Sequence, residues 1–268
     1  MIRPGRVDRG VRGTLPPMVF TGVGVALVTL FGDDGEVDAD ATAAHAARLV
    51  ELGVAAVVVA GTTGEAAALS IDERERLLAA VRSAVDGVPV IAGTGAPSAR
   101  QAADLTTRAR DGGADAVLTL SPPQTADPRP YYEQVAAAAG AMPVLAYHFP
   151  KIAPPGLPVE VIGALPVAGC KDSTGDAERL LVTLRTTALP LYTGSSALLS
   201  LAGPAGCAGA ILALANVEPE RCIAAFGGDA DVQRDLIDAH VAIHDRFPVG
   251  LKALMAQRFG TGRTTRVG

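Results

Sequence analysis

The chain has 268 residues, a formal net charge of −5 and 49% hydrophobic residues. This length and composition allow a large buried core, either in one α/β unit or in two smaller domains, and differ from those of disordered proteins. The slightly acidic balance, with no basic cluster beyond scattered arginines near the start, argues against nucleic-acid or acidic-membrane partners. The longest apolar runs, 54–60 and 208–215, are well short of the roughly 20 residues that cross a bilayer.

The cysteines and the first residues indicate the compartment. Cys170, Cys207 and Cys222 lie in apolar surroundings, without the spacing of metal ligands, which favours buried free thiols over disulfides or zinc. Residues 1–13 contain arginines but no long apolar core, so we do not expect a secretory signal. The sequence therefore predicts a cytoplasmic protein.

From about residue 22, short apolar runs alternate with longer alanine-rich segments of helical spacing, which is typical of repeated βα units. The predicted strands are residues 23–30, 54–60, 88–92, 116–120, 143–147, 167–171, 191–193 and 208–212. The predicted helices are residues 38–52, 71–85, 99–111, 131–139, 177–186 and 197–202, and two more over 232–247 and 249–259. Ser70 and Glu73 have the spacing of a capping box at the start of one helix.

Eight such units predict an α/β protein whose parallel strands close into a (β/α)8 TIM barrel, with a short C-terminal helical extension. The expected divisions are a tail over 1–20, the barrel over 21–227, helices over 228–260 and a tail over 261–268. The alternative is a doubly wound open sheet. No Gly-x-Gly-x-x-Gly follows the first strand, which weakens a dinucleotide-binding fold.

Lys171 ends a predicted strand at residues 167–171 and precedes a polar turn. Strand alternation would turn Lys171 inward together with Gly169 and Val167. Burial disfavours the charged form of an amine, and a free amine is a nucleophile. The alternative is a surface lysine at a strand end.

Other polar residues follow the predicted strands, where a barrel builds its active site. They are Thr62, Thr63, Glu65, Thr94, Ser121, Gln124, Tyr147, Ser195 and Ser196. Tyr147 could carry protons for Lys171, or it is a core residue with a satisfied hydroxyl. The loop Gly61-Thr62-Thr63-Gly64 could hold a phosphate or carboxylate with its backbone N–H groups, or it is an ordinary glycine turn.

No metal site is expected. His45, His240 and His244 fall on predicted helices remote from the strand ends, and they have no acidic partners at ligand spacing. Alternation points His148 away from the barrel interior. Asp33, Asp34 and Glu36 indicate a solvated turn rather than a calcium loop, because the later ligands of such a loop are missing.

Three motifs in this order, Gly61-Thr62-Thr63-Gly64-Glu65, Tyr147-His148-Phe149-Pro150 and Gly169-Cys170-Lys171-Asp172, resemble the dihydrodipicolinate synthase and N-acetylneuraminate lyase family of class I aldolases. The resemblance covers about residues 23–260. It implies a (β/α)8 barrel and a homo-oligomer, tetramer or dimer, that needs no cofactor because a lysine forms an imine with pyruvate.

By position, the resemblance implies that Lys171 is the Schiff-base lysine and that Tyr147 shuttles protons. It also implies that Gly61, Thr62 and Thr63 hold the pyruvate carboxylate. Ile211 would line the pocket with its backbone carbonyl. The implied partner is a small oxo acid, with neither nucleic acid nor membrane.

Two departures bear on the substrate. Where the synthases of this family have a relay tyrosine the chain has Gln124, and where they have a carboxylate-binding arginine it has Ile152. Ser195 and Ser196 argue against a large polyol. We therefore expect reversible aldol cleavage of a 4-hydroxy-2-oxo acid, of the 4-hydroxy-2-oxoglutarate or 2-keto-3-deoxy sugar acid type.

The alternatives are condensation of pyruvate with aspartate semialdehyde, as in 4-hydroxy-tetrahydrodipicolinate synthase, a non-catalytic metabolite-binding member, or a dehydratase of the same family.

Overall fold

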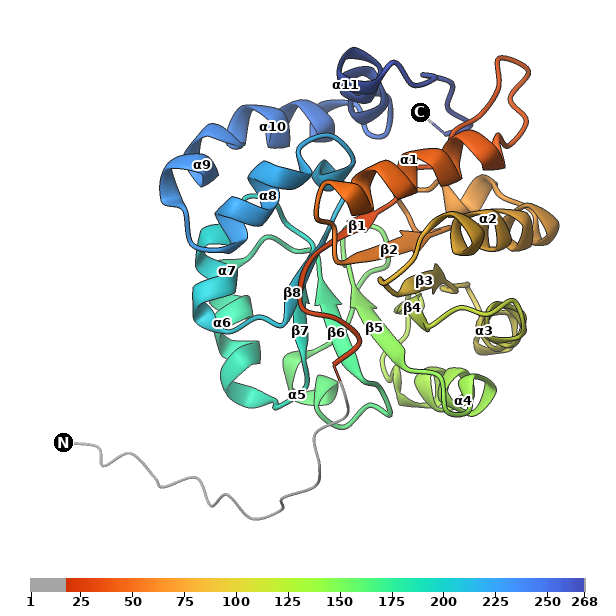
Figure 1. Cartoon of the computed structure of the whole chain (residues 1–268). Coiled ribbons are helices and arrows are strands. Elements are labelled where there is room, and N and C mark those ends of the chain that lie inside the picture. The colour runs from red at the N-terminus through yellow and green to blue at the C-terminus, as the bar shows by residue number, and fades with distance from the viewer. Residues whose placement is uncertain (1–17, 268) are drawn as a thin grey trace.

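Eight parallel strands close into a barrel in the computed structural model, which describes residues 18–267 (Figure 1). Each strand pairs with the next along the chain, and β1 (Gly22–Ala26) also pairs with β8 (Gly209–Leu212). The other strands are β2 (Ala56–Val59), β3 (Val90–Gly93), β4 (Ala116–Leu120), β5 (Val144–His148), β6 (Gly169–Asp172) and β7 (Leu191–Thr193). The predicted barrel is confirmed, and the open sheet is wrong.

Helices surround this barrel and cover its outer face (Figure 1). They are α1 (Ala39–Glu51), α2 (Ile71–Ala84), α3 (Ala99–Asp111), α4 (Arg129–Ala139), α5 (Val159–Ile162), α6 (Ala177–Thr186), α7 (Leu199–Ala205) and α8 (Pro219–Phe226), with 3-10 turns η1 (Ala66–Ala68) and η2 (Leu214–Asn216). The helices form because their apolar residues recur at helical spacing: α1, for example, buries Ala43, Ala46 and Leu49 on one side. The core between helices and strands is continuous around the ring.

The barrel interior has its own core, formed by every second strand residue. It contains Phe20, Ala26, Ala56, Val58, Ile91, Ala116, Leu118, Leu145, Tyr147, Tyr192 and Ile211. Phe20 precedes β1 and stacks on Tyr192 with ring centroids 4.7 Å apart. The Tyr192 hydroxyl donates to the Phe20 carbonyl at 3.0 Å. Phe20 therefore closes the amino-terminal end of the barrel, and the chemistry is expected at the other end.

Three helices follow the barrel: α9 (Ala230–Asp235), α10 (Ile237–Asp245) and α11 (Val249–Phe259). The segment expected to be helical over 232–247 is helical, but as two helices that are separated at the fully buried Leu236. Apolar periodicity continues through this break, so the pattern alone does not reveal it.

The segment after Gly260 contains no helix or strand within the described residues, yet it packs on the barrel, next to the loop between β1 and α1 (Figure 1). Of the N-terminal tail expected over residues 1–20, residues 1–17 lie outside the part of the chain that the structure describes.

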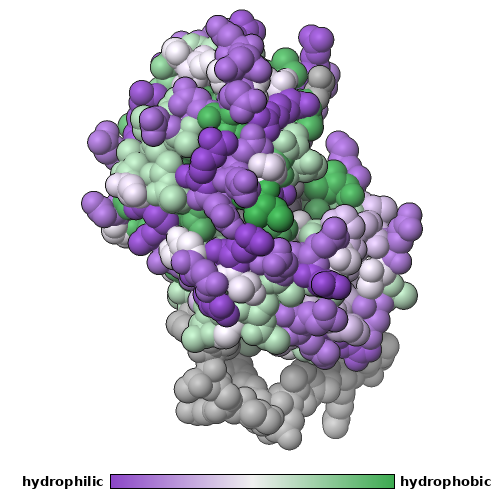
Figure 2. Space-filling model, turned by 90° about the vertical axis from the view of Figure 1, so that its right-hand side faces the viewer, coloured by the Kyte–Doolittle hydropathy of each residue, from purple (hydrophilic) through white to green (hydrophobic). Residues whose placement is uncertain are grey.

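None of the helices within residues 18–267 combines the length and apolar character needed to span a membrane. On the face seen in Figure 2, hydrophobic residues lie in small groups between hydrophilic ones.

Candidate active site

Lys171 and Tyr147 lie side by side on neighbouring strands. They are register partners on β6 and β5, and each is 5% exposed. The Lys171 Nζ atom lies 4.2 Å from the centroid of the Tyr147 ring. Within residues 18–267, no carboxylate pairs with this amine and no hydrogen bond engages it. A buried amine beside a phenol is therefore available for reaction.

Gly194, directly after β7, makes room for the lysine. A Cβ atom added there would lie 3.0 Å from Lys171 Cε and 1.9 Å from Ser173 Oγ. Lys171 and Ser173 therefore project toward the same space, as strand alternation requires. Sequence reasoning considered Ser173 only as a helix cap and did not place it beside Lys171. The signal was its spacing of two residues from Lys171.

The loop after β2 has the backbone of an anion site. Glu65 N–H donates to the Thr62 carbonyl at 3.1 Å, and Ala66 N–H donates to that of Gly61 at 3.2 Å. These bonds fold the loop into a tight turn that leads into η1. Among the described residues, the N–H groups of Thr62 and Thr63 have no acceptor, and neither do their hydroxyls. Consecutive free N–H groups suit a carboxylate.

The residues predicted to bind the substrate differ in how deeply they are buried. Thr63 is 6% exposed, whereas Gly61 and Thr62 are half-buried. Ile211 on β8 is fully buried and shares the interior cluster with Tyr147. Because a parallel barrel gathers the carboxyl ends of its strands at one rim, the loop after β2 and the ends of β5, β6 and β8 face a common space.

Asp172, the neighbour of Lys171, is held outside the barrel. Arg179 Nε donates to its Oδ2 atom at 2.7 Å, and the Thr174 hydroxyl donates to Oδ1 at 2.6 Å. Arg179 also donates to the Leu157 carbonyl at 2.6 Å. These contacts fix the turn after β6, so that Lys171 is anchored from its outer side.

His148 belongs to the same outer network. Its Nδ1 atom accepts from Leu157 N–H at 2.7 Å. Burial, together with the charge of Arg179, lowers the pKa of His148 to about 4. The ring is therefore neutral near pH 7 and supports the backbone, which agrees with its predicted outward orientation.

His240 is placed differently from the prediction. We expected it on a helix remote from the strand ends, but its Nδ1 atom lies 2.8 Å from Ser196 Oγ in the loop after β7. The helix break at Leu236, which the sequence pattern did not reveal, separates α9 from α10, and both helices contact this loop. Gln233 of α9 donates to the Ser196 carbonyl at 2.9 Å.

The other predicted strand-end residues differ in their contacts: the buried Ser121 hydroxyl has no partner among the described residues, whereas that of Thr94 has two. The Thr94 hydroxyl is 2.8 Å from that of Thr119 and 3.2 Å from that of Thr106 on α3, so it faces the helices. Gln124 is exposed, with a φ of 56°, and Ile152 is 44% exposed. Neither supplies a phenol or a guanidinium at its position.

Within the described chain, no three His, Cys, Asp or Glu side chains are grouped as a metal site would require. The three cysteines are free and buried, and burial raises the pKa of the Cys207 and Cys222 thiols to about 12. That of Cys170 is raised as well. These thiols are therefore protonated and unreactive near neutral pH.

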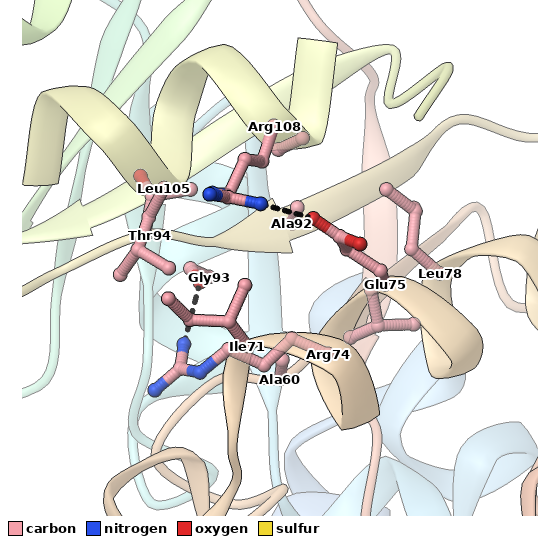
Figure 3. A pocket seen from close by; sticks show the side chains of 12 residues that line it. Ala60, Ile71, Arg74, Glu75, Leu78, Ala92, Gly93, Thr94, Leu105 and Arg108 are labelled. Carbon is pink, nitrogen blue, oxygen red and sulfur yellow. Dashed lines mark hydrogen bonds and ion pairs between the residues drawn. The ribbon is translucent and has the colours of Figure 1, made fainter. Parts of the chain in front are cut away.

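A cavity of about 30 Å³ lies outside the strands, between α2 and α3 (Figure 3). It has room for about one water molecule, which is too little for an oxo acid. Arg74 at its edge donates to the Gly93 carbonyl at 3.2 Å and also to the Ala66 carbonyl.

The chain matches the family model of the dihydrodipicolinate synthetase family over residues 19–238. It belongs to this family. The resemblance noted in the sequence is thereby confirmed, and the chain is an enzyme of the class I aldolase type, a carbon–carbon lyase.

Three proteins illustrate the similarity. A 4-hydroxy-tetrahydrodipicolinate synthase of Natronomonas pharaonis is 36% identical over 232 residues, which are 81% of this chain and 79% of that protein. The crystal structure of a dihydrodipicolinate synthase from Bacillus anthracis superposes with a TM-score of 0.86 at 26% identity, covering 93% of this chain and 92% of that one. YagE from Escherichia coli K12, in complex with pyruvate, has a TM-score of 0.82 at 25% identity, covering 91% and 89%.

Proposed function

We propose that this family member cleaves and forms a 4-hydroxy-2-oxo acid, with Lys171 as the Schiff-base nucleophile and pyruvate as one product. The observation that carries the proposal is the buried Lys171 amine, unpaired among the described residues and 4.2 Å from the Tyr147 ring. A structural relative that binds pyruvate, YagE, supports the choice of oxo acid. The aldehyde partner is a small molecule.

Each residue has a defined part in the reaction. The amine of Lys171 attacks the C2 carbonyl, and loss of water gives an imine. Tyr147 gives its proton to the hydroxyl that leaves as water, and its phenolate then takes the proton of the 4-hydroxyl group. The C3–C4 bond breaks, and an aldehyde leaves. The remaining enamine takes up a proton at C3, and hydrolysis releases pyruvate and the free lysine.

The loop after β2 orients the substrate. Its free N–H groups at Thr62 and Thr63, with the two hydroxyls and Gly61, would bind the carboxylate. Ile211 would line the opposite side. Fixing the carboxylate places the keto carbon against the amine, and this orientation lowers the entropic part of the barrier.

Trapping the imine tests the nucleophile. Incubation with pyruvate and borohydride should add one reduced pyruvate to Lys171, detected by peptide mass. Lys171→Ala should abolish the adduct. Lys151→Ala, which removes an exposed lysine, should leave it intact. The absence of an adduct in the unchanged protein would contradict the proposal.

The synthase reaction is a second candidate, because the Natronomonas pharaonis relative carries that name. Gln124 and Ile152 argue against it. We expect the purified protein to release pyruvate from 4-hydroxy-2-oxoglutarate faster than it condenses pyruvate with aspartate semialdehyde. The reverse preference would favour the synthase.

We also propose that the protein is a homo-oligomer, either a tetramer or a dimer. Analytical sedimentation would determine its mass.

A further inference from the structure

Glu65 directly follows the loop that we assign to the substrate carboxylate. It is 2% exposed, and its φ of 57° lies in the left-handed region that non-glycine residues seldom adopt. Such a backbone persists only where the surroundings determine it. What holds Glu65 therefore helps to determine the shape of the loop.

Three donors hold the Glu65 carboxylate, and all come from the last part of the chain. Lys252 Nζ on α11 donates to Oε1 at 2.7 Å, and both side chains of this pair are fully buried. The backbone N–H groups of Arg266 and Val267 donate to Oε2 at 2.7 and 2.9 Å. A buried carboxylate with this many donors is held strongly, because the alternative is an unpaired charge in the core.

Two of the donors, the N–H groups of Arg266 and Val267, lie in a segment that we call the strap, residues 261–267, and the third, Lys252, is bonded to it. Lys252 Nζ also donates to the Thr264 carbonyl at 2.7 Å. The Lys252 ammonium and the Arg266 guanidinium lie over the ring of Phe31, at 4.4 and 4.8 Å from its centroid. One aromatic ring thus supports both cations.

The Arg266 side chain ties the strap to the loop after β1 and to the chain that follows Glu65. Its Nε atom donates to the Gly35 carbonyl at 2.8 Å, and its terminal nitrogens donate to the Ala68 carbonyl at 3.0 Å and to Glu73 at 2.7 Å. The hydrogen bond from Arg266 is the main reason why the pKa of Glu73 is lowered to about 2. Arg266 therefore joins the end of η1 to the first turn of α2.

Contacts with Arg74 and Thr29 also fix the backbone of the loop after β2. Arg74 donates to the Ala66 carbonyl. It also donates to the Gly93 carbonyl on β3 (Figure 3). The Thr29 hydroxyl donates to the Gly64 carbonyl at 2.7 Å. The N–H groups of Thr62 and Thr63 are left without protein acceptors among the described residues.

We propose that Glu65 is a positioning residue for the oxo-acid carboxylate, and that Lys252 and the strap act on substrate binding through it. Glu65 itself does not touch the substrate, since its carboxylate is engaged by Lys252 and the strap. It keeps the turn in the conformation that aims the Thr62 and Thr63 N–H groups at the carboxylate. This inference rests on the proposed function and adds a second layer of residues to it.

The test is the pyruvate concentration that gives half-maximal trapping of Lys171 by borohydride. Arg266→Ala removes the side-chain contacts of the strap and should raise that concentration about tenfold. At saturating pyruvate, trapping should still reach completion, because the reactive groups on β5 and β6 are unchanged. Tenfold weaker binding is about 1.4 kcal/mol.

Arg258→Ala is the matched control. Arg258 also lies on the C-terminal part of the chain, bonds to the Val217 carbonyl and pairs with Glu220, but makes no contact with the loop after β2. It should lower the melting temperature without changing the half-trapping concentration. Equal concentrations for the unchanged protein and Arg266→Ala would overturn the inference, as would equal shifts in both variants.

A second variant covers a failure of Arg266→Ala to fold. Replacing the buried pair together, Glu65→Met with Lys252→Met, leaves no unpaired charge in the core and should fold. It should raise the half-trapping concentration as well, and an unchanged value would overturn the inference. The absence of any adduct in the unchanged protein would overturn the proposed function and this inference together, whereas an adduct with unshifted variants overturns the inference alone.

Discussion

A methyl group added at Gly194 would fill the space beside the Lys171 side chain. In Gly194→Ala the new Cβ atom would lie 1.9 Å from Ser173 Oγ and 3.0 Å from Lys171 Cε, so both side chains must move. Overpacking of this kind costs about 1–3 kcal/mol of stability. The displaced amine can no longer meet a bound carbonyl carbon, so we expect imine trapping at Lys171 to fall at least tenfold, by the order of 1.4 kcal/mol in barrier.

Gly163→Ala serves as the comparison, because its Cβ atom would also be tight, 3.1 Å from Thr187 Oγ1, but at the end of α5, away from β6. It should trap pyruvate normally. Normal trapping in Gly194→Ala as well would show that the space beside Lys171 is not limiting.

His45 predicts a pH dependence of stability. It is 1% exposed on α1, its two ring nitrogens have no hydrogen-bond partner among the described residues, and burial lowers its pKa from 6.5 to about 4. Between these values the unfolded chain binds a proton that the folded protein does not. The free energy of unfolding therefore falls as the pH decreases from 6.5 to 4, by about 3 kcal/mol from this residue, and levels off below.

Urea unfolding at pH 7 and pH 4.5 measures this effect. In His45→Leu the loss on acidification should be smaller than in the unchanged protein. His148 remains and titrates in the same range, so part of the loss persists in the variant. Identical losses in both proteins would show that His45 does not carry the effect.

At the scale of single elements, the α2 amino terminus gives a clear energetic prediction. Ser70 Oγ accepts from Glu73 N–H at 3.2 Å, and Glu73 Oε2 accepts from Ser70 N–H at 2.7 Å, so the capping box predicted from the sequence is present. Ser70→Ala should lower the free energy of unfolding by about 1 kcal/mol. Ser83→Ala, on an exposed position of the same helix, should change it by less than about 0.5 kcal/mol. Urea denaturation distinguishes the two outcomes.

The sequence predicted the presence of most helices and strands, but not where β1 ends or where the shortest helices lie. The strand predicted over 23–30 ends at Ala26, and Leu27 and Val28 are buried although they lie beyond it. Hydrophobicity marks burial, and the sequence alone does not separate a buried strand from a buried loop. The short helices α5 and α8 were not predicted, since four and eight residues hold too few turns for a periodic signal.

At the site, the strand-end rule and the resemblance together were enough to nominate Lys171, Tyr147 and the loop at Thr62. They could not reveal the contacts of Glu65. Lys252 and Val267 are 187 and 202 positions away along the chain, and nothing local in the sequence marks such a pairing. Glu65, the last residue of the first motif, became informative only because the fold brings the strap to it.

For the molecule as a whole, we expect one end of the barrel to contribute mainly to stability and the other to carry the reaction. A pair of variants tests this difference. Phe20, 7% exposed, closes the amino-terminal end against Tyr192, while Tyr147 lies beside Lys171 near the carboxyl ends of the strands. Phe20→Ala leaves a cavity and should cost about 3–5 kcal/mol of unfolding free energy. The loop after β2 and the ends of β5 and β6 are untouched, so trapping at Lys171 should persist wherever the variant is folded.

Tyr147→Phe should behave in the opposite way. It retains the ring that packs in the interior and loses only the hydroxyl, which has no protein partner among the described residues, so unfolding should change by less than about 1 kcal/mol. Loss of a positioned proton carrier should lower the cleavage rate by about 10²–10⁴-fold. Urea unfolding and pyruvate release, measured on both variants, test this division between the closed end and the reactive end of the barrel. A large loss of activity in folded Phe20→Ala would contradict it, and so would full activity in Tyr147→Phe.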